Sequence, residues 1–175
     1  LGKLNGATGT YGAFAINAEA PKRLAEICSD KKAKLIHFST DYVFDGMKSA
    51  PYEVDDARGP RSVYGKSKAE AEVRLREILP GCCIVRTSWL FGVGGRCFPD
   101  TILRLAASRS EIDVVDDQRG SPTYAADLAR AVVELCTAGA TGIVHATNRG
   151  ECSWFEFARE IVAGAGLKTM VRPTT

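Results

Sequence analysis

The sequence lacks any apolar run of roughly 18 residues, the length that a helix needs to cross a bilayer. It also lacks an excess of one charge: 23 Lys and Arg stand against 21 Asp and Glu, and the basic residues are scattered. No charged and apolar leader opens the chain, so secretion gets no support. We therefore expect neither a membrane nor a nucleic-acid partner.

Patterns that bind metals are also missing. The chain has two histidines, and its six cysteines include no CxxC pair. Most of these cysteines lie in apolar segments, which is typical of buried, reduced thiols and not of a disulfide framework or a zinc site. We expect no metal, and the cysteine usage points to the cytoplasm.

Short apolar runs alternate with longer helical patterns along the 175 residues. This alternation is typical of an α/β protein with a doubly wound parallel sheet. The expected strands are 33–39, 82–87, 112–115, 142–146 and 168–172. The expected helices start at Ala13, at Ser62 and at Ser153, with two more over 98–108 and 124–138.

Three side chains form a candidate reaction centre. Thr40 follows an apolar run and so lies at the exit of a buried strand, while Tyr64 and Lys68 are four apart and share one face of a helix. A tyrosine can protonate the alkoxide formed when a ketone is reduced, and a nearby lysine is expected to lower its pKa of about 10. Thr40 offers a hydroxyl that polarises the carbonyl. Together they indicate a carbonyl–alcohol oxidoreductase.

For two polar residues in apolar segments, a structural role stands beside a functional one. Asn17 lies in the apolar stripe of the first helix, where it is either a structural tie or the holder of a water near the site. His37 lies inside the first strand, and we expect it to be a hydrogen-bonded core histidine and not a ligand.

Several stretches together carry a resemblance that covers Ala13 to Pro173. They are Ile16-Asn17-Ala18, His37 to Gly46, Pro51-Tyr52-Glu53, Tyr64-Gly65-Lys66-Ser67-Lys68, Arg86-Thr87-Ser88-Trp89, Asp117 to Thr123 and Asp127-Leu128-Ala129. With them the sequence resembles the extended short-chain dehydrogenase/reductases, and among those the dTDP-4-dehydrorhamnose reductase family. The resemblance implies a Rossmann-like fold and NADPH or NADH as cofactor. It also implies reduction of dTDP-4-dehydro-L-rhamnose to dTDP-L-rhamnose, for polysaccharide biosynthesis.

The resemblance also implies roles for individual residues. Tyr64 is the proton donor and Lys68 contacts the nicotinamide ribose, with Ser39 on the cofactor side. Thr40 and Asp41 face the sugar. Two further substrate contacts are expected: Trp89, whose indole packs on the deoxysugar, and Arg119, which either meets the nucleotide phosphates or is a solvated loop arginine.

The implied domain plan has two parts. Residues 13–92 form the Rossmann-like catalytic part, and residues 93–175 form mainly a small α/β part that binds substrate, with 124–146 returning to the Rossmann core. Residues 1–12 are Gly-rich, and Gly6 to Gly12 fit a GxxGxxG phosphate loop. Too few apolar residues precede this heptad for a strand, so we favour a flexible segment. Most of the family's N-terminal cofactor half is then absent.

Other functions stay open at this point. One relative of the family is the regulatory subunit of methionine adenosyltransferase, so a non-catalytic interaction subunit is the main alternative. The complete set of Thr40, Tyr64 and Lys68 favours the reductase. A remnant without function, which would expose unpaired sheet edges, is a third hypothesis. A homodimer is also an expectation.

Overall fold

The structure is a computed structural model that describes residues 10–175. The Gly-rich heptad begins in residues 1–9, so the prediction about it lies largely outside the described residues. The chain divides into two compact units, and each is described by itself: residues 10–87 with 132–146, and residues 88–131 with 147–175. The division falls within helix α5 (Ala125–Thr137).

The first unit begins with one long helical stretch whose hydrogen-bonding pattern changes along its length. Helix α1 (Thr10–Phe14) passes into a π-helical turn η1 (Ala15–Glu19), which continues as α2 (Ala20–Lys31). Lys32 ends α2 in the left-handed conformation, with φ of 54°. The helix predicted from Ala13 is confirmed, but its π-helical turn was not foreseen; such turns are frequent at functional sites.

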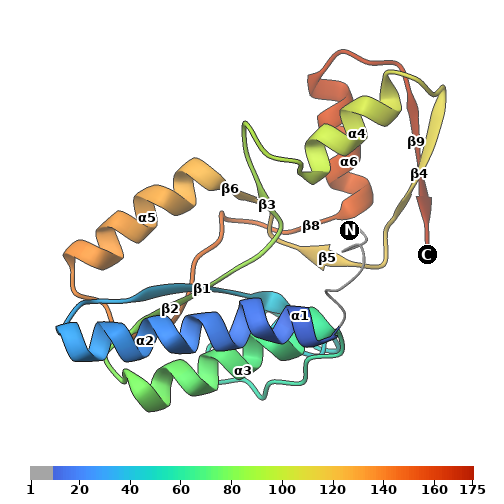
Figure 1. The fold of residues 1–175 in the computed structure, drawn as a ribbon. Coiled ribbons are helices and arrows are strands. Elements are labelled where there is room, and N and C mark those ends of the chain that lie inside the picture. Colours follow the sequence, from blue (N-terminus) through green and yellow to red (C-terminus); the bar gives the residue numbers. More distant parts are fainter. Residues whose placement is uncertain (1–9) are drawn as a thin grey trace. The chain divides into compact units, whose positions relative to one another are not determined.

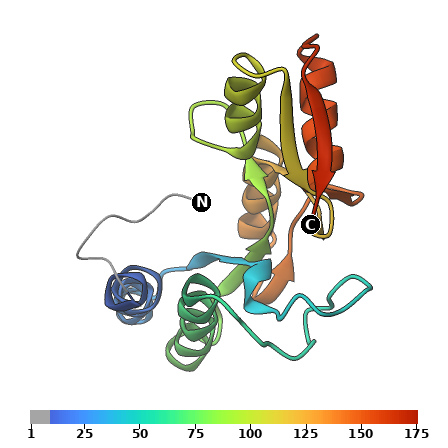
Figure 2. The same cartoon turned by 90° about the vertical axis from the view of Figure 1, so that its right-hand side faces the viewer.

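A parallel sheet of three strands forms the centre of this unit (Figure 1). Its order is β1 (Ile36–Thr40), β2 (Cys83–Thr87) and β7 (Gly142–His145). Helix α3 (Val63–Ile78) and α2 lie side by side against one face of the sheet (Figure 2). Their core is a cluster of buried residues: Ala25, Ala71, Leu75, Cys82 and Ile84. The predicted parallel α/β fold is confirmed.

Strand β1 differs from the prediction in its surroundings. A parallel strand covered on both faces was expected, but among residues 10–175 β1 pairs only with β2, and Phe38 is 44% exposed. The expectation for His37 was wrong as well. Its Nε2 is buried and has no hydrogen-bond partner among the described residues.

The second unit packs helices α4 (Phe98–Ala106) and α6 (Trp154–Gly164) on a parallel pair of strands, β4 (Glu111–Val115) and β9 (Met170–Thr174). Two short strand pairs tie its loops together. In parallel, β3 (Leu90–Phe91) pairs with β6 (Thr123–Tyr124); in antiparallel, β5 (Arg119–Gly120) pairs with β8 (Cys152–Ser153). The longer elements match the predicted ones to within a few residues.

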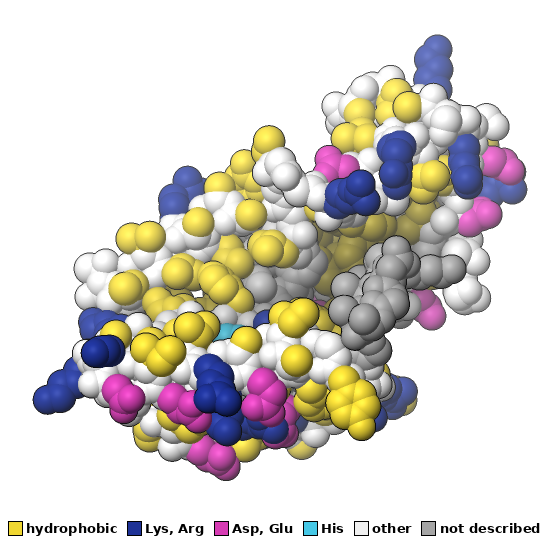
Figure 3. All heavy atoms as spheres, viewed as in Figure 1, with side chains coloured by type: hydrophobic (Ala, Val, Ile, Leu, Met, Phe, Trp, Pro, Cys, Tyr) yellow, Lys and Arg dark blue, Asp and Glu magenta, His cyan; other side chains and the backbone are white. Residues whose placement is uncertain are grey.

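The burial of the cysteines and the distribution of surface charge agree with the sequence predictions in part. All six cysteines are free, but only Cys82 and Cys83 are buried, and Cys136 is exposed. Figure 3 shows Lys, Arg, Asp and Glu side chains intermixed along α2, without a patch of one sign on that face. Among the described helices, none is both long and apolar enough to cross a membrane. Within residues 10–175 no three potential metal ligands come together.

Candidate active site

The first part of the site is the turn that follows β1. Thr40 ends the strand and is 6% exposed; its Oγ1 accepts a hydrogen bond from the Tyr42 N–H at 3.3 Å and donates to Asp41 Oδ1 at 2.9 Å. This local bonding closes the turn η2 (Asp41–Val43). Burial raises the pKa of Asp41, and the hydrogen bond from Thr40 only partly opposes that rise.

Helix α3 carries Tyr64 and Lys68 to this turn. Ser62 caps the helix as predicted, since its Oγ accepts from the Gly65 N–H at 3.0 Å. Gly65 is needed for the approach: a Cβ there would lie 2.1 Å from the Tyr42 carbonyl oxygen. The rings of Tyr64 and Tyr42 then meet edge to face, with centroids 6.1 Å apart.

The pKa of Tyr64 differs from our expectation. Burial raises this pKa above 10, the nearby Thr40 hydroxyl opposes the rise, and the negative charge of Asp41 adds to it. We expected Lys68 to lower it. Instead the Lys68 Nζ donates to the Phe38 carbonyl at 3.0 Å, and burial lowers the pKa of the lysine itself. With a pKa above 10 the Tyr64 phenol is protonated at neutral pH, and it is a weaker acid in this structure than the sequence predicted.

The π-helical turn connects to the same helix. Asn17 donates from Nδ2 to Ser67 Oγ at 3.0 Å, and Ser67 in turn donates to the Tyr64 carbonyl at 2.8 Å. Of the two interpretations of Asn17, the structural tie is therefore present. The tie fixes α3 at the turn that carries Tyr64.

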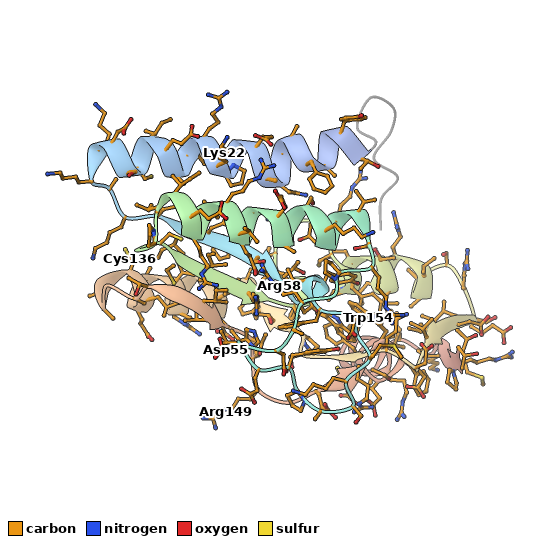
Figure 4. All side chains as sticks on the ribbon, turned by 90° about the horizontal axis from the view of Figure 1, so that it is seen from below. Lys22, Asp55, Arg58, Cys136, Arg149 and Trp154 are labelled. Atoms are coloured by element: carbon orange, nitrogen blue, oxygen red, sulfur yellow. The ribbon has the colours of Figure 1, made fainter. Side chains whose placement is uncertain are left out.

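A buried ion pair lies behind the strand exit. Glu72 is fully buried, and Arg86, 3% exposed, holds it through Nε at 2.9 Å and Nη2 at 2.7 Å. Ser39 donates to the same carboxylate at 2.6 Å, so its hydroxyl is already committed. Arg58, labelled in Figure 4, approaches Glu72 Oε2 at 3.4 Å. Burial alone would raise the pKa of Glu72, but the bonds from Arg86 and Ser39 outweigh it and hold the pKa below its usual value.

The second unit contains Trp89 and Arg119. Trp89 stacks on Trp154 with ring centroids 3.5 Å apart and planes at 8°. Arg119 pairs with Glu151 at 3.2 Å and with Glu156 at 3.3 Å while its side chain stays half exposed. Its guanidinium is thus already neutralised by carboxylates. The proposed contacts of these two residues with substrate stay predictions.

Sequence reasoning missed Glu72, Arg86 as its partner, and Trp154. A signal was available for the ion pair: Arg86 lies in a strand predicted to be buried, and a buried guanidinium requires a carboxylate. Glu72 lies four residues beyond Lys68, on the same face of α3. Trp154 gave no such signal, because a tryptophan at a helix start is ordinary in a core.

A parallel α/β sheet with a threonine at a strand exit and a Tyr/Lys pair on the next helix defines a Rossmann-like protein of the dehydrogenase/reductase class. The RmlD substrate binding domain family model matches residues 9–175. The chain belongs to this family.

Known relatives agree with this assignment. The chain is 44% identical over 170 residues to the dTDP-4-dehydrorhamnose reductase of Mycobacterium tuberculosis, covering 93% of this chain and 56% of the relative. A solved dTDP-4-dehydrorhamnose reductase of Clostridium acetobutylicum is 40% identical with a TM-score of 0.93, over 95% of this chain and 59% of that one. The Bacillus anthracis reductase in complex with NADP is 41% identical with a TM-score of 0.92, over 95% and 60%. The chain thus spans little more than half the length of these relatives.

Proposed function

We propose that this chain supplies the proton-donor and sugar-binding side of an NAD(P)H-dependent reductase that converts dTDP-4-dehydro-L-rhamnose to dTDP-L-rhamnose. The observation that carries the proposal is the turn after β1, where Thr40 ends the strand, the Tyr64 ring packs edge to face on Tyr42, and Lys68 donates to the Phe38 carbonyl of the same strand. The relatives named as reductases of dTDP-linked keto sugars support the substrate class.

The acid chemistry follows from the residues of the first unit. As hydride adds to the 4-keto carbon, negative charge develops on the carbonyl oxygen, and a donor must supply a proton there. Tyr64 holds that proton at neutral pH, and Thr40 offers a second hydroxyl. Thr40 donates to Asp41 in this structure, so turning its hydroxyl to the substrate would exchange one acceptor for another.

The residues present fit a nicotinamide nucleotide in part. When bound, this cofactor supplies the hydride. Lys68 has three N–H donors, of which the Phe38 carbonyl uses one, so it can also bind a ribose hydroxyl. Tyr64 is half exposed and can do the same. Ser39 is 3% exposed and bonded to Glu72, so its hydroxyl is the weakest of the proposed cofactor contacts.

The proposed contacts of the sugar nucleotide are Thr40, Asp41, Trp89 and Arg119. Asp41 and Thr40 present a carboxylate and a hydroxyl to sugar hydroxyls, and Trp89 offers an indole. Arg119 would have to exchange Glu151 and Glu156 for a phosphate. A nucleotide phosphate at Arg119 would therefore compete with the carboxylates of Glu151 and Glu156.

NADPH oxidation with dTDP-4-dehydro-L-rhamnose tests the proposal. It should be measured for this chain alone and for a chimera that adds the part of the Bacillus anthracis reductase that the chain does not cover. We expect turnover by the chimera. A chimera that binds NADPH and dTDP-L-rhamnose but oxidises no NADPH would contradict the proposal and favour a non-catalytic interaction subunit.

A further inference from the structure

The indole of Trp89 is enclosed on both faces within the second unit. Trp154 covers one face, because the two rings are nearly parallel with centroids 3.5 Å apart. A Cβ built on Gly120 would lie 2.5 Å from Cε2, 2.7 Å from Nε1 and 2.8 Å from Cζ2 of Trp89. Such similar distances place that Cβ over the ring plane. None of these nearest atoms belongs to Trp154, so Gly120 covers the opposite face.

The backbone of Trp89 is held in an unusual conformation. Its φ is 47°, in the left-handed region that a bulky residue rarely adopts. The neighbouring chain stabilises it: the Trp89 carbonyl accepts from the Thr123 N–H at 3.2 Å, and Ser88 donates to the Ser121 carbonyl at 2.7 Å. Strain of this kind persists where the surroundings determine the conformation several times over, and it is concentrated at functional sites.

Trp154 is itself held in place at the start of α6. It is the first residue of α6, directly after Ser153, which forms a capping box with Glu156. Phe98 packs against it with centroids 4.4 Å apart. The β5–β8 pair aligns Gly120 with Cys152, two residues before Trp154. This pairing brings Gly120 and Trp154 to the same Trp89 indole.

We propose that Trp154 and Gly120 are positioning residues that clamp Trp89, so that its indole meets the nucleotide sugar with its edge and its Nε1–H. The ring faces are not available for stacking on the sugar while the clamp is closed. Nε1 is only a donor, so an oxygen of the sugar nucleotide suits it. This inference rests on the proposed function and changes the expected contact of Trp89 from face to edge.

The test compares variants of this chain in their affinity for dTDP-L-rhamnose, measured by calorimetry. Trp154→Leu and Gly120→Ala should each weaken binding about tenfold, the equivalent of one positioned hydrogen bond. Trp154→Phe keeps an aromatic cover and should stay within about threefold. Gly164→Ala is the matched control for Gly120→Ala, because a Cβ there meets nothing within 4 Å; its affinity should not change.

A spectroscopic readout separates positioning from a purely structural role. The chain has only two tryptophans, so its indole signals come from this pair alone. Trp154→Phe leaves Trp89 as the sole tryptophan, and its emission should shift when dTDP-L-rhamnose binds.

Each result has one meaning. Tight binding by the unchanged chain with equal affinity for Trp154→Leu and Gly120→Ala would overturn the clamp and leave the proposed function standing. No shift of the Trp89 emission at saturating ligand would overturn the contact with the sugar. No binding by the unchanged chain and none by the chimera would overturn the proposed function and the inference with it. If Gly120→Ala does not fold, the comparison of Trp154→Phe with Trp154→Leu decides.

Discussion

The Glu72 ion-pair cluster of the first unit and the Arg119 cluster of the second unit differ in burial. In the first unit Glu72 and Arg86 are 0% and 3% exposed, and the cluster also engages Ser39 and Arg58. In the second unit Arg119 is 49% exposed, and its partners Glu151 and Glu156 are 61% and 46% exposed. Ion pairs of the same kind are therefore buried behind the strand exit in the first unit and exposed on the surface of the second.

The difference shows how each unit holds its functional side chains. The first unit has a network of charges and hydrogen bonds behind Thr40. Removing one charged member leaves its partner buried without a counter-charge. The second unit holds Trp89 by ring stacking, a close glycine and short strand pairs, which are insensitive to charge. The first site should respond strongly to charge and pH, and the second should respond weakly.

The largest effect is expected for Glu72→Ala. This change leaves the Arg86 guanidinium buried without its carboxylate, and it should lower the free energy of unfolding by about 3–5 kcal/mol. Urea unfolding measures the loss. The double variant Glu72→Ala with Arg86→Met should recover part of it, and a loss below about 1 kcal/mol in the single variant would break the comparison.

A smaller effect concerns pH and His37. Burial lowers the pKa of His37 from 6.5 to about 4, and the charge of Lys68 adds to this. Between about pH 4 and pH 6.5, His37 is protonated in the unfolded state and neutral in the folded state. Stability is therefore lost as pH falls from 6.5 towards 4. Between about pH 7 and about pH 5 the loss should be about 2 kcal/mol.

The variant His37→Gln should remove most of that loss, since glutamine does not titrate. Urea unfolding at both pH values checks the prediction. Glu72, whose pKa is lowered, also loses its stabilising contribution on acidification, but only below its ordinary value of 4.5. An equal loss in the variant and the unchanged chain would mean that His37 is not the group responsible.

The smallest effect is expected for Arg119→Ala. Exposed ion pairs contribute little, so the free energy of unfolding should change by less than about 1 kcal/mol, and less still at high salt. Thermal unfolding with and without added salt measures it. A loss as large as that of Glu72→Ala would contradict the distinction between the two clusters.

Local signals made much of this protein predictable. Helix starts at Ser62 and Ser153, the strand ending in Thr40 and the spacing of Tyr64 and Lys68 are all read within a few residues of sequence. The features that escaped prediction join distant segments. The π-helical turn, the Glu72–Arg86 pair and the Trp89–Trp154 stack depend on tertiary packing, which no local pattern specifies. The pKa of Tyr64 was misjudged for the same reason, because it depends on burial.

The proposed reaction depends most directly on Tyr64 as proton donor. The decisive measurement is the single-turnover rate of NADPH oxidation with dTDP-4-dehydro-L-rhamnose in the chimera, compared with its Tyr64→Phe variant at equal NADPH occupancy. Removal of a general acid should slow the reaction by about 10²–10⁴-fold while the affinity for NADPH stays nearly unchanged. An unchanged rate in Tyr64→Phe would contradict the assignment.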